Sequence, residues 1–104
     1  MEITSSELKL KIQNGDKMII DFWAPWCGPC KMLAKNLESV NTGIPIEVID
    51  IDVHDNIAQD YGIRSVPTLV MLDENTEIKR LIGMQPLKQL EDWLNQNEIQ
   101  KHIH

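Results

Sequence analysis

The chain has 104 residues, of which 42% are hydrophobic and 25% charged, and its formal net charge is -6 at pH 7. This length suits one domain over residues 1–104 that folds around its own core without disulfide staples, and the composition excludes a disordered or collagen-like chain. The acidic balance argues against binding to nucleic acid phosphates. The sequence from Met1 lacks the pattern of a secretory signal, and its apolar runs are too short to cross a membrane, so we expect a cytoplasmic protein with no membrane attachment.

The spacing of apolar residues predicts helices and strands in alternation. Thr4 and Glu7 fit a capping box at the start of the first helix, and Pro86 suits the first position of the last helix. The predicted elements are a helix over about 5–14, a strand over 17–23, a helix from 27 to about 42, a strand over 44–53, a helix over about 56–61, a hairpin of strands 68–73 and 77–83 around a turn at 74–76, and a helix over 86–97. Strands separated by helices indicate a parallel sheet covered on both faces, and the hairpin adds an antiparallel edge. The predicted fold class is therefore α/β with a central mixed sheet.

The chain has two cysteines, Cys27 and Cys30, in the motif Trp-Cys-Gly-Pro-Cys. In a cytoplasmic protein, such a pair is more typical of redox catalysis or metal binding than of a structural disulfide or of two inert buried thiols. A zinc site needs four ligands, and the remaining nitrogen donors are His54, His102 and His104. The two terminal histidines lack the spacing of a zinc-finger pair, so we favour redox chemistry without a metal, and zinc stays the alternative.

The position of the pair at a predicted helix start assigns different roles to the two thiols. Cys27 faces backbone N–H groups at the positive end of the helix dipole, which favours its thiolate, so it is the predicted nucleophile. Cys30 lies one turn further on and deeper, which suits a thiol that resolves the mixed disulfide. Between them, Gly28 lets another backbone approach closely, and Pro29 fixes the first turn without loss of a hydrogen bond.

The segment DFWAPWCGPCKM, residues 21–32, resembles the active-site segment of the thioredoxin family. The segment YGIRSVPT, residues 61–68, and Gly83 after the hairpin match the family's other two active-site segments, so the resemblance covers essentially the whole chain. It implies the thioredoxin fold and a protein-disulfide reductase that uses no cofactor other than the redox-active pair. It also implies a cis peptide bond before Pro67, a conformation adopted by about 5–6% of X–Pro bonds in folded proteins. The alternative is an ordinary trans proline before a strand.

The resemblance also implies a surface that receives extended protein segments carrying a disulfide. This apolar patch around Cys27 consists of Trp26, Gly62, Ile63, Val66, Gly83 and Met84. Phe22 and Trp23 are expected in the core or beneath the site. Met84 and Ser65 stand where the family tends to have smaller residues, which bears on substrate preference. The implied partners are disulfide-containing proteins and a separate thioredoxin reductase, because the chain has no glycine-rich dinucleotide motif, and we expect a monomer.

Asp21 is an anomaly inside an apolar strand, six residues before Cys27. Burial there should raise the pKa of its carboxyl group. By resemblance it is the family's buried aspartate, which assists deprotonation of Cys30 through water; the alternative is a carboxyl group that hydrogen-bonds a neighbouring backbone. Val48 aligns where the family often has a lysine beside this aspartate, and Lys35 where a helix-kinking proline is common, so the tuning of Asp21 is in question.

Two further functional classes compete with the reductase. An isomerase or oxidant is disfavoured because Gly-Pro between the cysteines resembles the reductive members of the family. A binding module would clamp a partner with the same apolar patch while the cysteines stay idle. Replacement of both cysteines by serine separates the classes, since binding would survive and electron transfer would not.

Overall fold

A computed structural model describes residues 3–96, which form four helices and four strands in the predicted order. The elements are α1 (Ser5–Gln13), β1 (Met18–Trp23), α2 (Gly28–Glu38), β2 (Ile46–Asp50), α3 (Asp55–Asp60), β3 (Thr68–Asp73), β4 (Thr76–Ile82) and α4 (Leu87–Asn95). The capping box is confirmed: the Thr4 hydroxyl accepts from the Glu7 backbone, and the Glu7 carboxylate accepts from the Thr4 backbone. No helix within the described residues is both long and apolar enough to span a membrane.

The four strands form one mixed sheet in the order β2-β1-β3-β4. Strands β1 and β2 are parallel, because α2 carries the chain back to the same edge between them, whereas β3 pairs antiparallel with both β1 and β4. The predicted mixed sheet is confirmed. Only one strand of the hairpin, β4, lies at the edge, and β3 is an inner strand beside β1.

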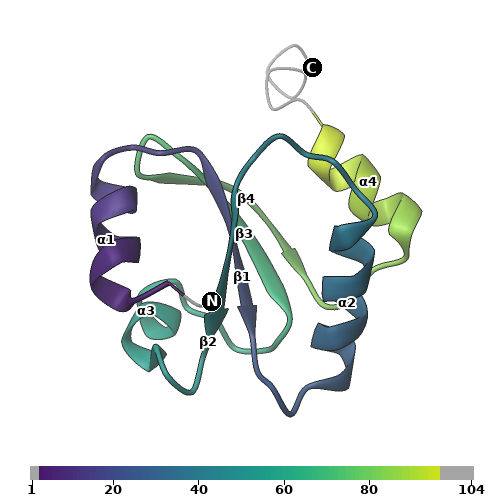
Figure 1. Ribbon diagram of the computed structural model, residues 1–104, viewed down its shortest axis with the longest axis horizontal. Helices are drawn as coiled ribbons and strands as arrows, with labels where there is room; N and C mark the ends of the chain where they lie inside the picture. Colours follow the sequence, from purple (N-terminus) through teal and green to yellow (C-terminus); the bar gives the residue numbers. More distant parts are fainter. Residues whose placement is uncertain (1–2, 97–104) are drawn as a thin grey trace.

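Two hydrophobic cores lie on opposite faces of the sheet. Figure 1 shows α1 and α3 on one face and α2 and α4 on the other. Successive side chains of a strand point to opposite faces, so β1 supplies Ile20 and Phe22 to the first core and Ile19 to the second. Because it serves both cores, β1 is buried along almost its whole length, which explains its apolar sequence.

The predicted second strand was too long. Residues 44–53 alternate apolar and polar, but β2 ends at Asp50, where the chain turns. The Asp50 carboxylate accepts a hydrogen bond from the Asp52 backbone (2.9 Å), and the Asp50 carbonyl accepts one from the His54 backbone (2.9 Å). Residues 51–53 continue the alternation of apolar and polar residues but lie in this turn, so the pattern extends beyond the strand.

Two predicted helix boundaries were also wrong. Helix α2 ends at Glu38, with Ser39 as its C-cap, and does not reach residue 42. Pro86 is the N-cap of α4 and not its first helical residue, since its backbone is still extended (φ -55°, ψ 153°). The predicted end of this last helix, Asn97, lies outside the described residues.

Candidate active site

The two cysteines lie at the start of α2, shortly after the end of β1. Figure 1 shows this passage from β1 into α2. They form a disulfide, with their Cα atoms 5.3 Å apart. Cys27 is the N-cap of α2, and its Sγ accepts a hydrogen bond from the Cys30 backbone N–H (3.1 Å). A helix N-terminus presents unpaired N–H groups and partial positive charge, so this position stabilises negative charge on Cys27 Sγ after reduction.

The two sulfur positions differ in access. Cys27 is 5% exposed and Cys30 1%, and both pack with Ala24, Trp23 and Val66 in a small apolar cluster. Cys30 is therefore the deeper of the two, as predicted.

The residues between the cysteines are both exposed. Pro29 lies in the first turn of α2, where its missing N–H removes no helical hydrogen bond. A Cβ atom added to Gly28 would meet no described atom within 4 Å. The space over Gly28 therefore opens outward, where the backbone of another molecule could approach.

The Val66–Pro67 peptide bond is cis, so the alternative of a trans proline is wrong. The Val66 carbonyl oxygen lies 3.8 Å from Cys27 Sγ, which places this loop directly against the disulfide. The Pro67 carbonyl accepts a hydrogen bond from the Gly83 backbone (2.8 Å), so the loop after β4 lies beside the cis peptide bond. Three segments far apart in the sequence thus meet at the cysteines.

The structure divides the predicted apolar patch into exposed and buried parts. Trp26 is 68% exposed, and Gly62 is exposed with a left-handed backbone (φ 64°) that favours glycine. Val66 is half-buried against the cysteine cluster. Ile63 packs against the core beneath α1 and α3, and Met84 against the core beneath α2 and α4. Ile63 and Met84 therefore contribute to the fold as well as to the surface.

Two contacts that support this patch were missed from the sequence. The indole N–H of Trp26 donates to the Asp52 carboxylate (2.8 Å), which fixes the exposed ring beside the cysteines. A signal for it existed: the carboxyl ends of parallel β1 and β2 meet at one edge, so an acidic residue after β2 lies near the loop after β1.

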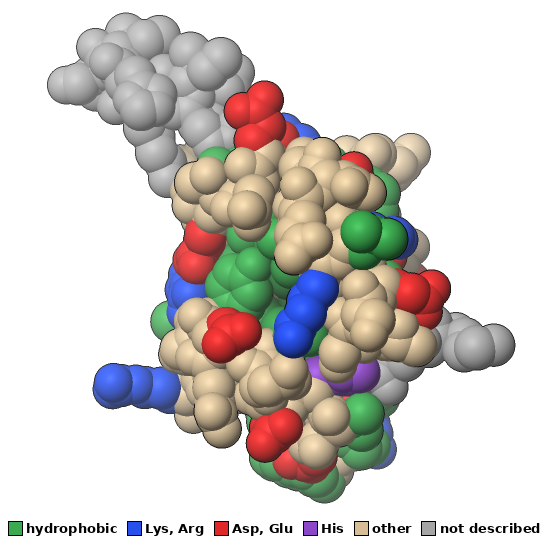
Figure 2. Space-filling view, turned by 90° about the vertical axis from the view of Figure 1, so that its left-hand side faces the viewer, with side chains coloured by type: hydrophobic (Ala, Val, Ile, Leu, Met, Phe, Trp, Pro, Cys, Tyr) green, Lys and Arg blue, Asp and Glu red, His purple; other side chains and the backbone are tan. Residues whose placement is uncertain are grey.

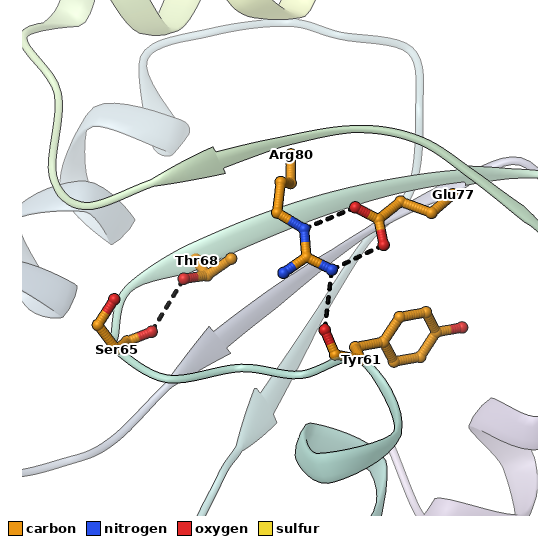
Figure 3. Close-up of polar contacts among 5 residues, drawn as sticks. All are labelled: Tyr61, Ser65, Thr68, Glu77 and Arg80. Atoms are coloured by element: carbon orange, nitrogen blue, oxygen red, sulfur yellow. Dashed lines mark hydrogen bonds and ion pairs between the residues drawn. The ribbon is translucent and has the colours of Figure 1, made fainter.

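The second missed contact is made by Arg80 of β4. Its guanidinium donates to both carboxylate oxygens of Glu77 (2.6 and 2.7 Å) and to the Tyr61 carbonyl (2.8 Å), at the start of the loop that ends in the cis bond (Figure 3). On the same loop, the Thr68 hydroxyl donates to the Ser65 carbonyl (2.9 Å). Both ends of the loop are therefore fixed by side chains of the hairpin.

Asp21 lies in the middle of β1 and is 2% exposed. Desolvation raises the pKa of its carboxyl group from 3.8 to about 7. Its Oδ1 atom is buried and has no hydrogen-bond partner among the described residues, so the alternative of a carboxyl oxygen that caps a neighbouring backbone finds no support there. The sheet register pairs Asp21 with Val48, which confirms their predicted proximity.

The described part of the chain contains no group of three or more His, Cys, Asp or Glu side chains placed to hold a metal ion. His54, one of the candidate zinc ligands, is buried and hydrogen-bonds through Nδ1 to the Ser5 hydroxyl. The other two candidates, His102 and His104, lie outside the described residues.

Comparisons with known proteins identify the family of this chain. The thioredoxin family model matches residues 1–96. The chain is similar to thioredoxin from Rickettsia felis, with 35% identity over 100 residues that cover 91% of this chain and 95% of that protein. It is 38% identical to thioredoxin from Bacillus subtilis over 84 residues, covering 77% of this chain and 81% of that protein. The solved structure of a thioredoxin from Malassezia sympodialis superposes with a TM-score of 0.78 at 32% identity, covering 94% of this chain and 90% of that one. The chain therefore belongs to the thioredoxin family of thiol–disulfide oxidoreductases.

Proposed function

We propose that the protein reduces disulfides in extended protein segments, with Cys27 as nucleophile and Cys30 as resolving thiol. The observation that carries this proposal is the Cys27–Cys30 disulfide at the start of α2, in contact with the Val66 carbonyl. The Cys27 thiolate attacks one sulfur of the substrate disulfide, forms a mixed disulfide and releases one substrate thiolate. The Cys30 thiolate then attacks Cys27 Sγ and releases the second substrate thiolate. Two electrons pass to the substrate, and the enzyme is left with the disulfide seen in the structure.

Asp21 is the proposed acceptor of the Cys30 proton, through water. Cys30 must lose its proton to attack, and it is almost fully buried. A carboxyl group whose burial raises its pKa to about 7 exchanges a proton close to neutral pH, which suits a general base at that pH.

The apolar patch, together with the loop that ends in the cis Val66–Pro67 bond, is the proposed substrate-binding surface. Trp26 supplies a large exposed ring, and Gly62 and Gly28 leave room for a second backbone. An extended segment that pairs with the Val66 backbone would bring its disulfide to Cys27, because the Val66 carbonyl lies 3.8 Å from Cys27 Sγ.

Recharging by a separate thioredoxin reductase follows from this reaction, since the oxidised enzyme needs two electrons for the next cycle. We place the reaction in the cytoplasm and treat the chain as a monomer that needs no metal or organic cofactor. These statements rest on the family and on the absence of a dinucleotide motif from the sequence.

The experiment that tests the proposal has two readouts. The Cys27–Cys30 couple is titrated in graded thiol–disulfide buffers, with the fluorescence of Trp23 and Trp26 as signal. A two-electron transition at a reduction potential of about -270 mV supports a reductant, and a potential between about -180 and -120 mV would overturn that assignment.

The second readout separates the two thiols. The Cys30→Ser variant should accumulate a mixed disulfide with a disulfide-bonded peptide, whereas Cys27→Ser should form none. Mixed-disulfide formation through Cys30 alone would reverse the proposed order of attack.

A further inference from the structure

A hollow of about 300 Å³ lies between β1, β2 and α2. Its lining consists of Asp21, Ala34, Leu37, Glu38, Ile46 and Val48. Val48 is 38% exposed and Ala34 is exposed, so the hollow opens to solvent between the sheet and the helix. Its walls are apolar, and a carboxyl group lies in its lining on each side, Asp21 on the strand and Glu38 on the helix.

One of the lining residues, Asp21, has a carboxyl oxygen without a hydrogen-bond partner among the described residues. The Asp21 side chain is 2% exposed, and its Oδ1 accepts no hydrogen bond from any described residue. A buried acceptor without a donor is unfavourable, and a buried carboxylate more so, unless a cation or a donor satisfies it. Apart from Asp21, the titratable side chain that lines the hollow is Glu38, which is also acidic. When Asp21 is ionised, the described residues of this lining therefore offer acceptors and negative charge, and no donor side chain.

The opposite face of the sheet provides a contrast. Figure 2 shows apolar side chains at the bottom of a recess over α1 and α3, with charged groups around it. This hollow of about 420 Å³ is lined by residues of both charges, Lys9 and Asp60. Among residues 3–96, two buried side-chain atoms lack a partner, Asp21 Oδ1 and Trp23 Nε1, and neither residue belongs to this lining. Volume alone does not distinguish the two hollows, whereas the unpartnered carboxyl oxygen does.

We propose that the hollow over Asp21 binds a primary alkylammonium ion. The ammonium group donates to the Asp21 carboxylate, the charge of Glu38 adds attraction at the helix side, and the alkyl tail lies against Leu37, Ile46 and Val48. A bare metal ion fits less well, because the lining offers two carboxyl groups and no further oxygen, nitrogen or sulfur side chain. Each methylene group that the hollow accommodates should tighten binding about fourfold.

Binding of such a cation is coupled to ionisation of Asp21. The ammonium ion favours the carboxylate, so it binds more tightly when Asp21 is ionised, and by reciprocity it promotes that ionisation. This consequence rests on the proposed proton role of Asp21: a bound amine would change how Asp21 accepts the Cys30 proton at neutral pH. The binding itself does not depend on that role.

The test is a titration of Asp21 by ¹³C NMR of its carboxyl carbon, with and without n-butylammonium chloride. At saturation, the pKa of Asp21 should fall from about 7 to about 6 or lower, because an opposite charge in contact lowers a carboxyl pKa by about 1 unit or more. Sodium chloride at equal ionic strength should leave the pKa unchanged. A blocked lysine, Nα-acetyl-lysine amide, is the second probe. It represents the lysine side chain of a partner protein, whereas n-butylammonium represents a free amine. If neither probe moves the Asp21 resonance, the proposal is wrong.

Matched variants locate the effect. Val48→Lys places a tethered ammonium in the hollow, so it should lower the pKa of Asp21 without ligand and abolish butylammonium binding. Val53→Lys adds the same side chain at a position that is 64% exposed and outside the lining, so both properties should stay as in the unmodified protein. A shift of the Asp21 resonance by butylammonium that survives in Val48→Lys would overturn the proposal. Because the readout is a resonance and not a rate, loss of disulfide reduction would contradict the proposed function and leave this inference standing.

Discussion

Replacement of Asp21 by asparagine should stabilise the fold at neutral and alkaline pH. The carboxyl group is 2% exposed, and desolvation raises its pKa to about 7 in the folded protein, compared with 3.8 ordinarily. Between these two values the folded protein holds a proton that the unfolded chain has released. Stability therefore falls as the pH rises from about 4 to about 7, and it becomes constant above that range.

The size of the effect follows from the same two values. Each pH unit across a window of about 3 units costs about 1.4 kcal/mol, so ionised Asp21 destabilises the fold by roughly 4 kcal/mol at pH 8. Asparagine has nearly the shape of the protonated carboxyl group and carries no charge. The Asp21→Asn variant should thus exceed the unmodified protein in stability by roughly this amount at pH 8, and by about 0.5 kcal/mol or less near pH 4.

Urea unfolding of the oxidised protein at pH 4 and pH 8 measures both differences. Asp16→Asn, at an exposed position, is the matched control and should show no such pH-dependent gain. The reasoning is refuted if Asp21→Asn gains the same stability at both pH values, or none at pH 8. A kinetic consequence accompanies the gain: the variant should slow resolution of the mixed disulfide more than the initial attack by Cys27. Equal slowing of both steps would remove Asp21 from the proton transfer.

Two other predictions concern single contacts. Thr4→Ala removes the cap of α1 and should lower the free energy of unfolding by about 1 kcal/mol, whereas Ser6→Ala in the same turn should not; equal losses would argue against the cap. Arg80→Lys removes the planar fork that holds the Tyr61 carbonyl, so it should cost about 1–2 kcal/mol in urea unfolding and raise KM for a disulfide-bonded protein. The redox potential of the cysteine pair should stay unchanged, and Arg64→Lys on the same loop is the control. An unchanged KM in Arg80→Lys would show that the loop does not need this tether.

The order of helices and strands could be predicted because β1, the hairpin and the helices have simple periodic patterns. The continuous apolar run of β1 reflects burial on both faces, and the capping box of α1 appears at its expected spacing. The end of β2 could not be predicted from periodicity. Ile51, in the turn directly after the strand, still packs against the core, so the alternation gives no sign that the strand has ended at Asp50. At the end of the strand, the Asp50 carboxylate accepts from the Asp52 backbone in the turn, a contact that the apolar pattern does not record.

In the active site, too, local features could be predicted from the sequence and contacts between distant segments could not. The roles proposed for Cys27 and Cys30 come from a motif at a predicted helix start, because both residues belong to one local segment. The supports of the site join distant segments: Trp26 with Asp52, and Arg80 with the Tyr61 carbonyl. The cis bond at Pro67 was predicted by family resemblance, whereas the residues alone favoured trans. Contacts of this kind depend on the sheet register, so they become visible only after the strands are paired.

Asp21 connects the stability of the fold to its chemistry. In β1, the even-numbered residues 18, 20 and 22 face the core under α1 and α3. Residue 21 therefore points to the other face of the sheet, toward α2, the helix that begins at the cysteines. An apolar residue there would fill the hollow and remove the cost of a buried carboxyl group, which is roughly 4 kcal/mol at pH 8. That cost is a large fraction of the stability of an ordinary domain. The raised pKa that weakens the fold is the same property that allows proton exchange near neutral pH. A single substitution at this position should therefore improve stability and impair resolution together.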